Sequence, residues 1–392
     1  MNTIYLDNSA TTPLSDAARE AIRAAMDNYG NPSSLHTVGL DGETLLKNAR
    51  RQVLGALGVR NPSSEQQKQL IFTACGTESN NTAILGTAYA KARREANRIV
   101  TTDSEHPSVE NALKKLESDG FEVVRISTRG GVLDSEAAMA ALGEKTLLVT
   151  MMMVNNETGA RYDIEPIFRE AKRRNPNTVT HTDAVQGFLK CKFSVQSLGA
   201  DLISISGHKI HAPKGVGALY IDPAMLKAKK LIPYLIGGGQ EFGLRSGTEN
   251  TLGIAAFGAA AEDGAAHLDE HLAHMSVLRG YAIEQLTAAG FPLNLPQGAC
   301  APHIVNLRLP DIKSETMLHF LSAQGICVSA GSACSSHGKH ASPTLTAFGL
   351  TASQADSSLR VSLSPYSTRE DIDALVSTLS RGAATLVRMR RR

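Results

Sequence analysis

The sequence is poor in the features that mark secreted, membrane and zinc-binding proteins. Its five cysteines are scattered and odd in number, and no two of them form a Cys-x-x-Cys pair. This pattern disfavours both a disulfide framework and a structural zinc site. The chain has no apolar run long enough to span a membrane, and its first residues carry no basic-then-apolar signal. We therefore expect a protein without metal or membrane anchor that works in a reducing cytoplasm.

A strong excess of charge of one sign is also missing. The net charge is +2, with 40 basic and 38 acidic residues interspersed along the chain, which argues against direct binding of nucleic acid. The only compact basic run lies at residues 388–392, where a solvated, frayed terminus is the simplest interpretation. We see no internal repeat and no low-complexity segment.

What the chain does have is length and apolar content. With 392 residues, of which 42% are hydrophobic, it can bury a large core, and two domains are the natural expectation. We place a large domain at residues 15–262 and a smaller α+β domain at 263–392, joined by the N-terminal segment 1–14. An Ala-rich helical stretch at 253–289 would connect them, and residues 304–309 resemble part of a hairpin.

Within the large domain, short apolar segments alternate with amphipathic ones. Because strands that alternate with helices form parallel sheets with helices on both faces, we predict an α/β fold with a mostly parallel, doubly wound sheet. The predicted strands lie at 69–73, 98–102, 121–127, 146–154, 178–182, 202–206 and 216–221.

A lysine lies between the last two of these strands. Lys209 follows the strand at 202–206 in a turn rich in Gly, His and Pro, and the next strand begins at Val216. An isolated loop lysine is usually solvated. A lysine at the end of a buried strand can instead lose hydration and become a nucleophile.

Several polar residues follow other strands, and ligands of open α/β sheets bind beyond the carboxyl ends of the strands. Gly76 and Thr77 open a helix, where free amides suit a phosphate, although an ordinary helix cap is equally compatible. His106 could be a structural histidine or a ring that stacks on a planar ligand and moves protons. Asp183 could cap a helix or serve as a buried carboxylate.

The segment Ser206-Gly207-His208-Lys209, followed by Pro213-Lys214-Gly215, resembles the Schiff-base segment of pyridoxal-phosphate enzymes of the class V aminotransferase group, in particular the cysteine desulfurases. The resemblance extends from Tyr5 to Arg360. It implies fold type I of the pyridoxal 5'-phosphate-dependent transferases and assigns Lys209 as the catalytic lysine that bonds to the cofactor.

The resemblance also implies the other residues of a cofactor site. Asp183 would keep the ring nitrogen of the cofactor protonated, as an electron sink requires, and Gln186 would bind its phenolic oxygen. His106 would stack on the ring as a further catalytic residue. Thr248 would reach the phosphate of the neighbouring subunit, so a homodimer is implied. The remaining phosphate ligands would be Gly76, Thr77, Ser206 and His208.

Substrate and sulfur have their own implied residues. Asn156 would contact the cofactor or the substrate carboxylate, and Arg360 would pair with that carboxylate through its guanidinium. Cys334 lies among Gly, Ser and Ala in a loop, which makes a cysteine accessible, and it matches the desulfurase nucleophile. Cys327 lies in the apolar 326–328 segment and is expected in the core. The implied activity converts L-cysteine to L-alanine, with the sulfur held as a persulfide on Cys334.

Other functions remain open at this stage. A selenocysteine lyase, another class V aminotransferase or a non-catalytic partner-binding homologue would share the fold. An aminotransferase has no use for a loop cysteine, and a non-catalytic homologue would not need Lys209, Asp183 and Cys334. The sulfur acceptor could be an iron–sulfur scaffold or a tRNA-thiolation enzyme. The sequence leaves open this acceptor, the preference between cysteine and selenocysteine, and any need for an activator protein. It also carries a polar insertion at 61–68.

Overall fold

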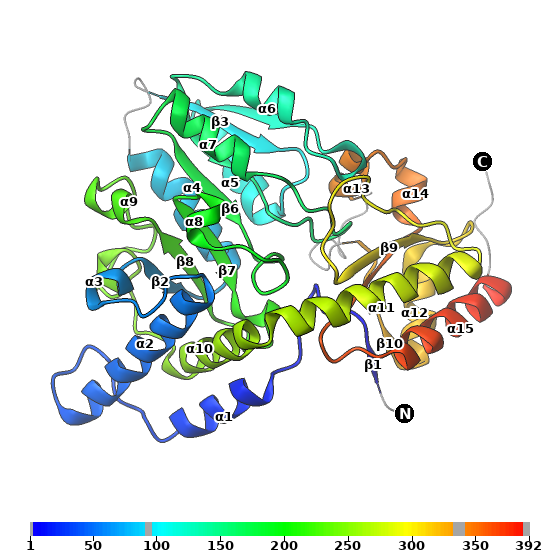
Figure 1. Cartoon of the computed structure of the whole chain (residues 1–392), viewed down its shortest axis with the longest axis horizontal. Coiled ribbons are helices and arrows are strands. Elements are labelled where there is room, and N and C mark those ends of the chain that lie inside the picture. Colours follow the sequence, from blue (N-terminus) through cyan, green and yellow to red (C-terminus); the bar gives the residue numbers. More distant parts are fainter. Residues whose placement is uncertain (1–2, 91–95, 332–341, 387–392) are drawn as a thin grey trace.

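The computed structural model describes residues 3–90, 96–331 and 342–386, and its centre is a seven-stranded sheet (Figure 1). The strands follow the order β2-β8-β7-β6-β5-β3-β4, and only β8 runs antiparallel to its neighbours. The predicted fold class, an α/β fold with a mostly parallel sheet, is therefore confirmed. The strands are β2 (Leu70–Thr73), β3 (Arg98–Thr102), β4 (Glu122–Ile126), β5 (Thr146–Thr150), β6 (Val179–Asp183), β7 (Leu202–Ser206) and β8 (Gly217–Ile221).

Helices cover both faces of the sheet. Successive residues of each strand point to opposite faces and therefore join different buried clusters. Leu148 and Leu202 belong to the buried cluster that includes α4 and α5, whereas their neighbours Val149 and Ile203 belong to the cluster that includes α2, α7 and α10. The helices are α2 (Thr37–Ala56), α4 (Gly76–Ala90), α5 (Pro107–Ser118), α7 (Glu165–Arg174) and α10 (Thr251–Ala266). The central strands β5 to β8 are consequently buried along their whole length.

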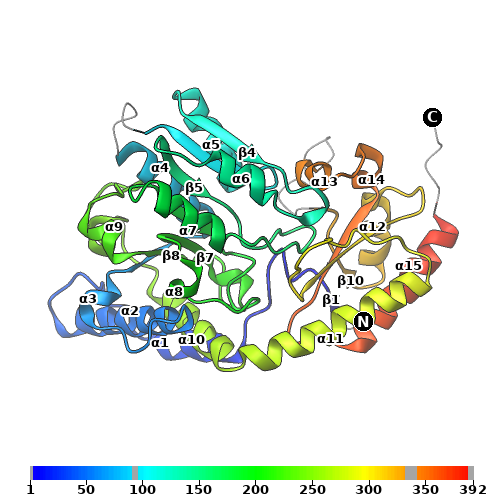
Figure 2. The same cartoon turned by 45° about the horizontal axis from the view of Figure 1, so that its top comes forward.

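A second core lies beside the large sheet (Figure 2). Strand β9 (Ile304–Arg308) pairs antiparallel with β11 (Ser358–Ser362), and β1 (Ile4–Tyr5) pairs parallel with β10 (Ile326–Cys327). Helices α11 (Leu268–Ala288), α12 (Ser314–Ala323) and α15 (Arg369–Thr385) supply the other apolar side chains. The N-terminal segment therefore contributes to this core, since Leu6 is fully buried in it.

Three segments differ from the sequence expectation. The stretch 253–289 forms two helices that meet at His267, because α10 packs against α1 and α2 whereas α11 packs on the second core. Residues 304–309 hold one strand whose partner β11 is distant in sequence. The 61–68 insertion contains a short helix, α3 (Ser64–Gln67), because Ser63 and Gln66 form a reciprocal capping box.

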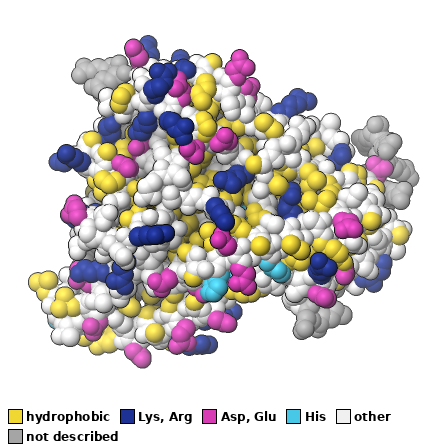
Figure 3. Space-filling view, in the orientation of Figure 1, with side chains coloured by type: hydrophobic (Ala, Val, Ile, Leu, Met, Phe, Trp, Pro, Cys, Tyr) yellow, Lys and Arg dark blue, Asp and Glu magenta, His cyan; other side chains and the backbone are white. Residues whose placement is uncertain are grey.

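The remaining elements are short and lie around these two cores. They are α1 (Asp16–Ala25), α6 (Ser135–Ala141), α8 (Val195–Leu198), α9 (Pro223–Lys227), α13 (Pro343–Phe348), α14 (Ala352–Asp356), and the 3-10 turns η1 (Arg129–Gly131), η2 (Gly207–Lys209) and η3 (Glu241–Gly243). Lys and Arg side chains are interspersed with Asp and Glu over the face in Figure 3. Within the described ranges, no helix combines the length and apolar character needed to cross a bilayer.

Candidate active site

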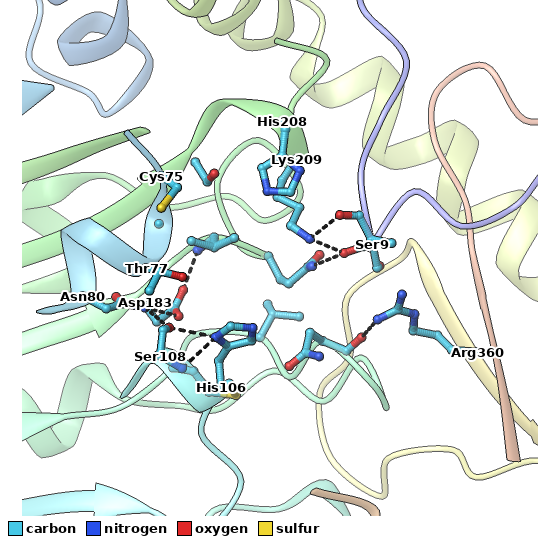
Figure 4. A pocket seen from close by; sticks show the side chains of 18 residues that line it. Ser9, Cys75, Thr77, Asn80, His106, Ser108, Asp183, His208, Lys209 and Arg360 are labelled. Atoms are coloured by element: carbon cyan, nitrogen blue, oxygen red, sulfur yellow. Dashed lines mark hydrogen bonds between the residues drawn. The ribbon is translucent and has the colours of Figure 1, made fainter. Parts of the chain in front are cut away.

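A cavity of about 170 Å³ lies beyond the carboxyl ends of β6 and β7 (Figure 4). It is lined on one side by residues of the large domain and on the other by Arg360 of β11 and the N-terminal residues Ser9 and Ala10. Ten residues singled out in the sequence line it together: Gly76, Thr77, His106, Asn156, Asp183, Gln186, Ser206, His208, Lys209 and Arg360.

Lys209 reaches this cavity from η2, directly after β7. Its Nζ donates to the backbone carbonyls of Ser9 and Ala10 at 2.6 and 2.8 Å. The turn before it is tightly packed, because a Cβ at Gly207 would lie 2.9 Å from Cγ1 of Val216. The N-terminal segment and the turn thus hold the amine in place.

Asp183 is the last residue of β6 and is only 6% exposed. Its Oδ1 accepts from the backbone N–H of Val185 at 2.9 Å, and its Oδ2 accepts from Nδ2 of Asn80 at 2.7 Å. These donors fix the orientation of the carboxylate at the wall of the cavity. A buried acceptor in this place suits a protonated ring nitrogen.

His106 is the N-cap residue of α5, and its ring lines the same cavity. The backbone N–H of Ser108 donates to Nδ1 at 3.1 Å, and Oγ of Ser108 lies 2.8 Å from the same nitrogen. Burial lowers the pKa of His106 below its ordinary value; Asp183 raises this pKa and Lys209 lowers it. A planar neutral imidazole in this position suits stacking on an aromatic ligand.

A phosphate group fits the end of the cavity at the start of α4. Free amides and the positive end of the helix dipole lie there, and Ser206 Oγ is buried without a hydrogen-bond partner among the described residues. A Cβ at Gly76 would lie 2.8 Å from Val185 and 3.4 Å from Ser206, so glycine keeps the approach open. Burial, followed by the charge of Lys209, lowers the pKa of His208 at this end to about 4. These features, with Asp183 and Lys209, fit pyridoxal phosphate.

Gln186 links the cavity to a buried polar group behind it. Its Nε2 donates to the carbonyl of Ser9 at 2.9 Å, the same oxygen that accepts from Lys209. Its Oε1 lies 3.2 Å from Nε2 of His303 and accepts from Lys190 Nζ at 3.4 Å. The donor end of this amide is therefore turned toward the Ser9 carbonyl that also binds Lys209, and its acceptor end toward Lys190 and His303.

Arg360 brings a cation from β11 to the opposite wall. Its Nη1 donates to the carbonyl of Asn156 at 2.8 Å and its Nη2 to Oδ1 of Asp7 at 2.9 Å. Its Nε is buried and lacks a partner among the described residues. The guanidinium is thus held in place at the cavity wall, where its positive charge suits an anionic ligand such as a carboxylate.

Two predicted site residues are not brought into this cavity by the described chain. Thr248 is exposed and does not line it. Cys334 lies outside the described residues. Ser342, the first described residue after that gap, donates from Oγ to Glu157 at 2.7 Å, and Glu157 adjoins Asn156 of the cavity wall. Cys327 is half-buried on β10, where it pairs with β1.

Sequence reasoning missed three residues of the site. Asn80 and Ser108 line the cavity and bond to Asp183 and His106, and Ser9 supplies a carbonyl to Lys209 and Gln186. The position of Asn80, three residues after Thr77, places it one turn along the same helix and was the available signal. A backbone acceptor such as Ser9 leaves no trace in residue type.

Residues 4–375 match the aminotransferase class-V family. The chain belongs to this family. It is 40% identical over 384 residues to a cysteine desulfurase of Trichormus azollae, which covers 97% of this chain and 92% of that protein. It is 35% identical over 381 residues to the cysteine desulfurase NifS of Azotobacter vinelandii, with 96% and 91% covered.

A solved structure of a NifS-like protein superposes with a TM-score of 0.89 at 33% identity, covering 98% of this chain and all 100% of that one. The family resemblance and the fold type predicted from the sequence are both confirmed. Enzymes of the class V family depend on pyridoxal phosphate, which agrees with the fit of the cavity.

Proposed function

We propose that this protein is a cysteine desulfurase that converts L-cysteine into L-alanine and holds the sulfur as a persulfide on Cys334. The observation that carries the proposal is the convergence of Lys209, Asp183 and Arg360 on one cavity of about 170 Å³. An amine, a buried carboxylate and a guanidinium around so small a space suit a small amino acid bound next to an aromatic cofactor.

Each of these residues has a distinct task. Pyridoxal phosphate, when bound, withdraws electrons from the α-carbon of an amino acid and so makes its side-chain bond labile. Asp183 keeps a proton on the ring nitrogen because a carboxylate favours the charged form. Lys209 moves the proton of the α-carbon, and Arg360 orients the substrate by pairing with its carboxylate.

Cys334 supplies the sulfur acceptor. Its thiolate attacks the substrate sulfur, an S–S bond forms, and the carbon–sulfur bond of the substrate breaks. A proton replaces the sulfur on that carbon, so one L-cysteine and one thiol yield L-alanine and one persulfide. The segment that carries Cys334 is joined to described residues beside the cavity, since Ser342 bonds to Glu157.

A homodimer completes the site in this proposal. Thr248 is exposed on the largely exposed 232–250 segment, outside the cavity of its own chain. Apolar side chains of the same segment face outward: Tyr234 is 51% exposed, Ile236 85% and Phe242 51%. Large apolar side chains at a surface mark a contact site, and a second copy seated there would bring Thr248 to the neighbouring phosphate.

The persulfide would pass to an acceptor protein, an iron–sulfur scaffold or a thiolation enzyme, without direct contact with nucleic acid. A reducing cytoplasm is the compartment that suits this chemistry, because a persulfide and a catalytic thiol need reducing conditions.

Two cysteine variants test the proposal. Cys334→Ser should bind pyridoxal phosphate with the wild-type spectrum, yet carry no persulfide and release no sulfide on reduction. Cys327→Ser is the matched control and should keep the persulfide. Mass spectrometry after brief cysteine treatment distinguishes the two, since added sulfur on Cys327, or full alanine production by Cys334→Ser, would contradict the assignment.

A further inference from the structure

A line of four side chains runs along the wall of the cavity from Asp183 to His106 (Figure 4). Asn80 Nδ2 lies 2.7 Å from Asp183 Oδ2 and 2.9 Å from Ser108 Oγ. Ser108 Oγ lies 2.8 Å from His106 Nδ1. Asn80 is 1% exposed and Ser108 8%, so solvent does not compete for these bonds.

The direction of every bond in this line follows from its two ends. A carboxylate can only accept, so Asn80 must present its NH₂ group to Asp183, and the same NH₂ group donates its second proton to Ser108. The hydroxyl of Ser108 then has its own proton left for Nδ1 of His106. At the other end, the backbone N–H of Ser108 also donates to Nδ1 at 3.1 Å, and a backbone N–H cannot reverse.

Because two donors meet at Nδ1, the neutral ring must carry its proton on Nε2. We propose that Asn80 and Ser108 are positioning residues that hold His106 in the Nε2–H form and link that form to the ionised Asp183. The inference rests on the proposed function in one respect, namely that Asp183 and His106 would contact the cofactor. His106 can donate a proton from Nε2, and Nδ1 cannot accept a proton without breaking the two hydrogen bonds that Ser108 makes to it.

The line Asp183–Asn80–Ser108–His106, called the relay below, couples the charge of Asp183 to the proton of His106. Any change that neutralised Asp183 would free Asn80 to turn its amide, and Ser108 could then donate to Asn80 instead of to His106. The charge of Asp183, which would hold the cofactor ring, therefore also determines which nitrogen of His106 carries the proton. Among the described residues, the charged groups that act on the ring are Asp183 at the end of β6 and Lys209 in η2.

Nitrogen-15 NMR of the histidine rings tests the relay directly in the full-length holoenzyme. The spectrum of a His106→Gln variant assigns the His106 signals by their loss. Wild-type His106 should show a protonated Nε2 and a hydrogen-bonded, unprotonated Nδ1. A proton on Nδ1 of His106 at neutral pH would overturn the proposal, and this result does not depend on any variant being folded.

Variants at the two relay residues measure the coupling. Ser108→Ala and Asn80→Leu should move the Nδ1 resonance and raise the pH at which His106 becomes protonated by about one unit, whereas Ser108→Thr should restore the wild-type values. If Asn80→Leu does not fold, Ser108→Ala carries the same test. Asn81→Ala is the matched control, because among the described residues that amide bonds to the backbone carbonyls of Thr77 and Ser108 and to no side chain.

The signals of His181, which bonds to Thr150 and Ser204 inside the sheet, should stay unchanged throughout. A role limited to capping α5 predicts instead that both relay variants lower the melting temperature and leave the His106 resonances and titration as in wild type. Production of alanine and sulfide is measured separately, so a failure of the desulfurase proposal is distinguishable from a failure of the relay.

Discussion

At the scale of single residues, Ser206 lines the cavity with a hydroxyl that has no hydrogen-bond partner among the described residues. Its Oγ is buried at the end of β7, and a buried hydroxyl without a hydrogen bond costs free energy. A phosphate oxygen that accepts from this hydroxyl would remove that cost. The residue therefore stabilises the bound state more than the free one.

Ser206→Ala should accordingly weaken the binding of pyridoxal phosphate by about tenfold, the effect of one hydrogen bond to a charged group. Titration of the apoenzyme with the cofactor, followed by absorbance, gives the dissociation constant. The matched control is Ser204→Ala on the same strand, whose Oγ bonds to His181. It should lower stability and leave the affinity unchanged, and equal affinities for wild type and Ser206→Ala would refute this role.

Lys190 is a buried amine behind the cavity, 7% exposed and close to Gln186. Burial, reinforced by the charge of Lys209, lowers the pKa of Lys190 from 10.5 to about 7. The unfolded chain then binds more protons than the folded chain between pH 7 and pH 10.5. Its contribution to the free energy of unfolding therefore rises with pH across this window and is least favourable below pH 7.

Lys190→Met should thus stabilise the protein more at about pH 6.5 than at about pH 9, by ~2 kcal/mol. Urea unfolding of both proteins at the two pH values measures this difference. Lys192→Met is the control, because Lys192 lies two residues further on with its side chain 67% exposed. If Lys190→Met stabilised the protein equally at both pH values, Lys190 would bind the same number of protons in the folded and the unfolded chain over this pH range.

At the scale of elements, a buried ion pair helps to anchor the segment around η3. Arg50 of α2 donates to both carboxylate oxygens of Glu241, at 2.8 and 3.2 Å, and Glu241 also accepts from the backbone N–H of Phe72 on the edge strand β2. The two side chains are 6% and 1% exposed. This pair ties the segment that carries Thr248 to the large sheet.

Removing the charge from one partner of such a pair leaves the other buried without compensation. Glu241→Gln should lower the free energy of unfolding by about 3 kcal/mol. The exposed pair Lys68–Glu65 provides the contrast, with side chains 46% and 80% exposed, and Glu65→Gln should cost less than about 1 kcal/mol. Urea unfolding measures both, and similar costs for the two variants would argue against a structural role of the Arg50–Glu241 pair.

At the scale of the whole molecule, the central question is whether one chain forms a complete site. Lys209 belongs to the chain whose cavity it lines, whereas the proposed role of Thr248 lies in the neighbouring chain. A mixed dimer of Lys209→Ala and Thr248→Ala chains would then contain one site with both residues intact and one site with neither.

Each of the two homodimeric variants should have low activity, and unfolding, mixing and refolding them together should recover up to about one quarter of the wild-type activity. This fraction follows because half of the randomly paired dimers are mixed and each of those has one intact site of two. Alanine formation and light scattering, which reports the dimer, provide the measurement. No recovery in mixed dimers would place Thr248 in the site of its own chain.

The sequence by itself determined the fold class and most of the cavity. Short buried strands separated by amphipathic helices have few alternatives to a parallel sheet, and the residues that follow such strands must meet at one edge. Lys209, Asp183 and Gly76 were predicted for this reason, together with the motif around Lys209. The break at His267 was not predicted, because Ala-rich sequence forms helix on either side of it.

Only the tertiary structure decided what lies between these residues. The carbonyl of Ser9, the amide of Asn80 and the hydroxyl of Ser108 reach the site through contacts between segments that lie far apart in the chain, up to 200 residues for Ser9 and Lys209. Hydrogen-bond partners of this kind depend on distance and direction and are not encoded in spacing along the chain. Residue types determine which chemistry is possible, and packing determines which donor faces which acceptor.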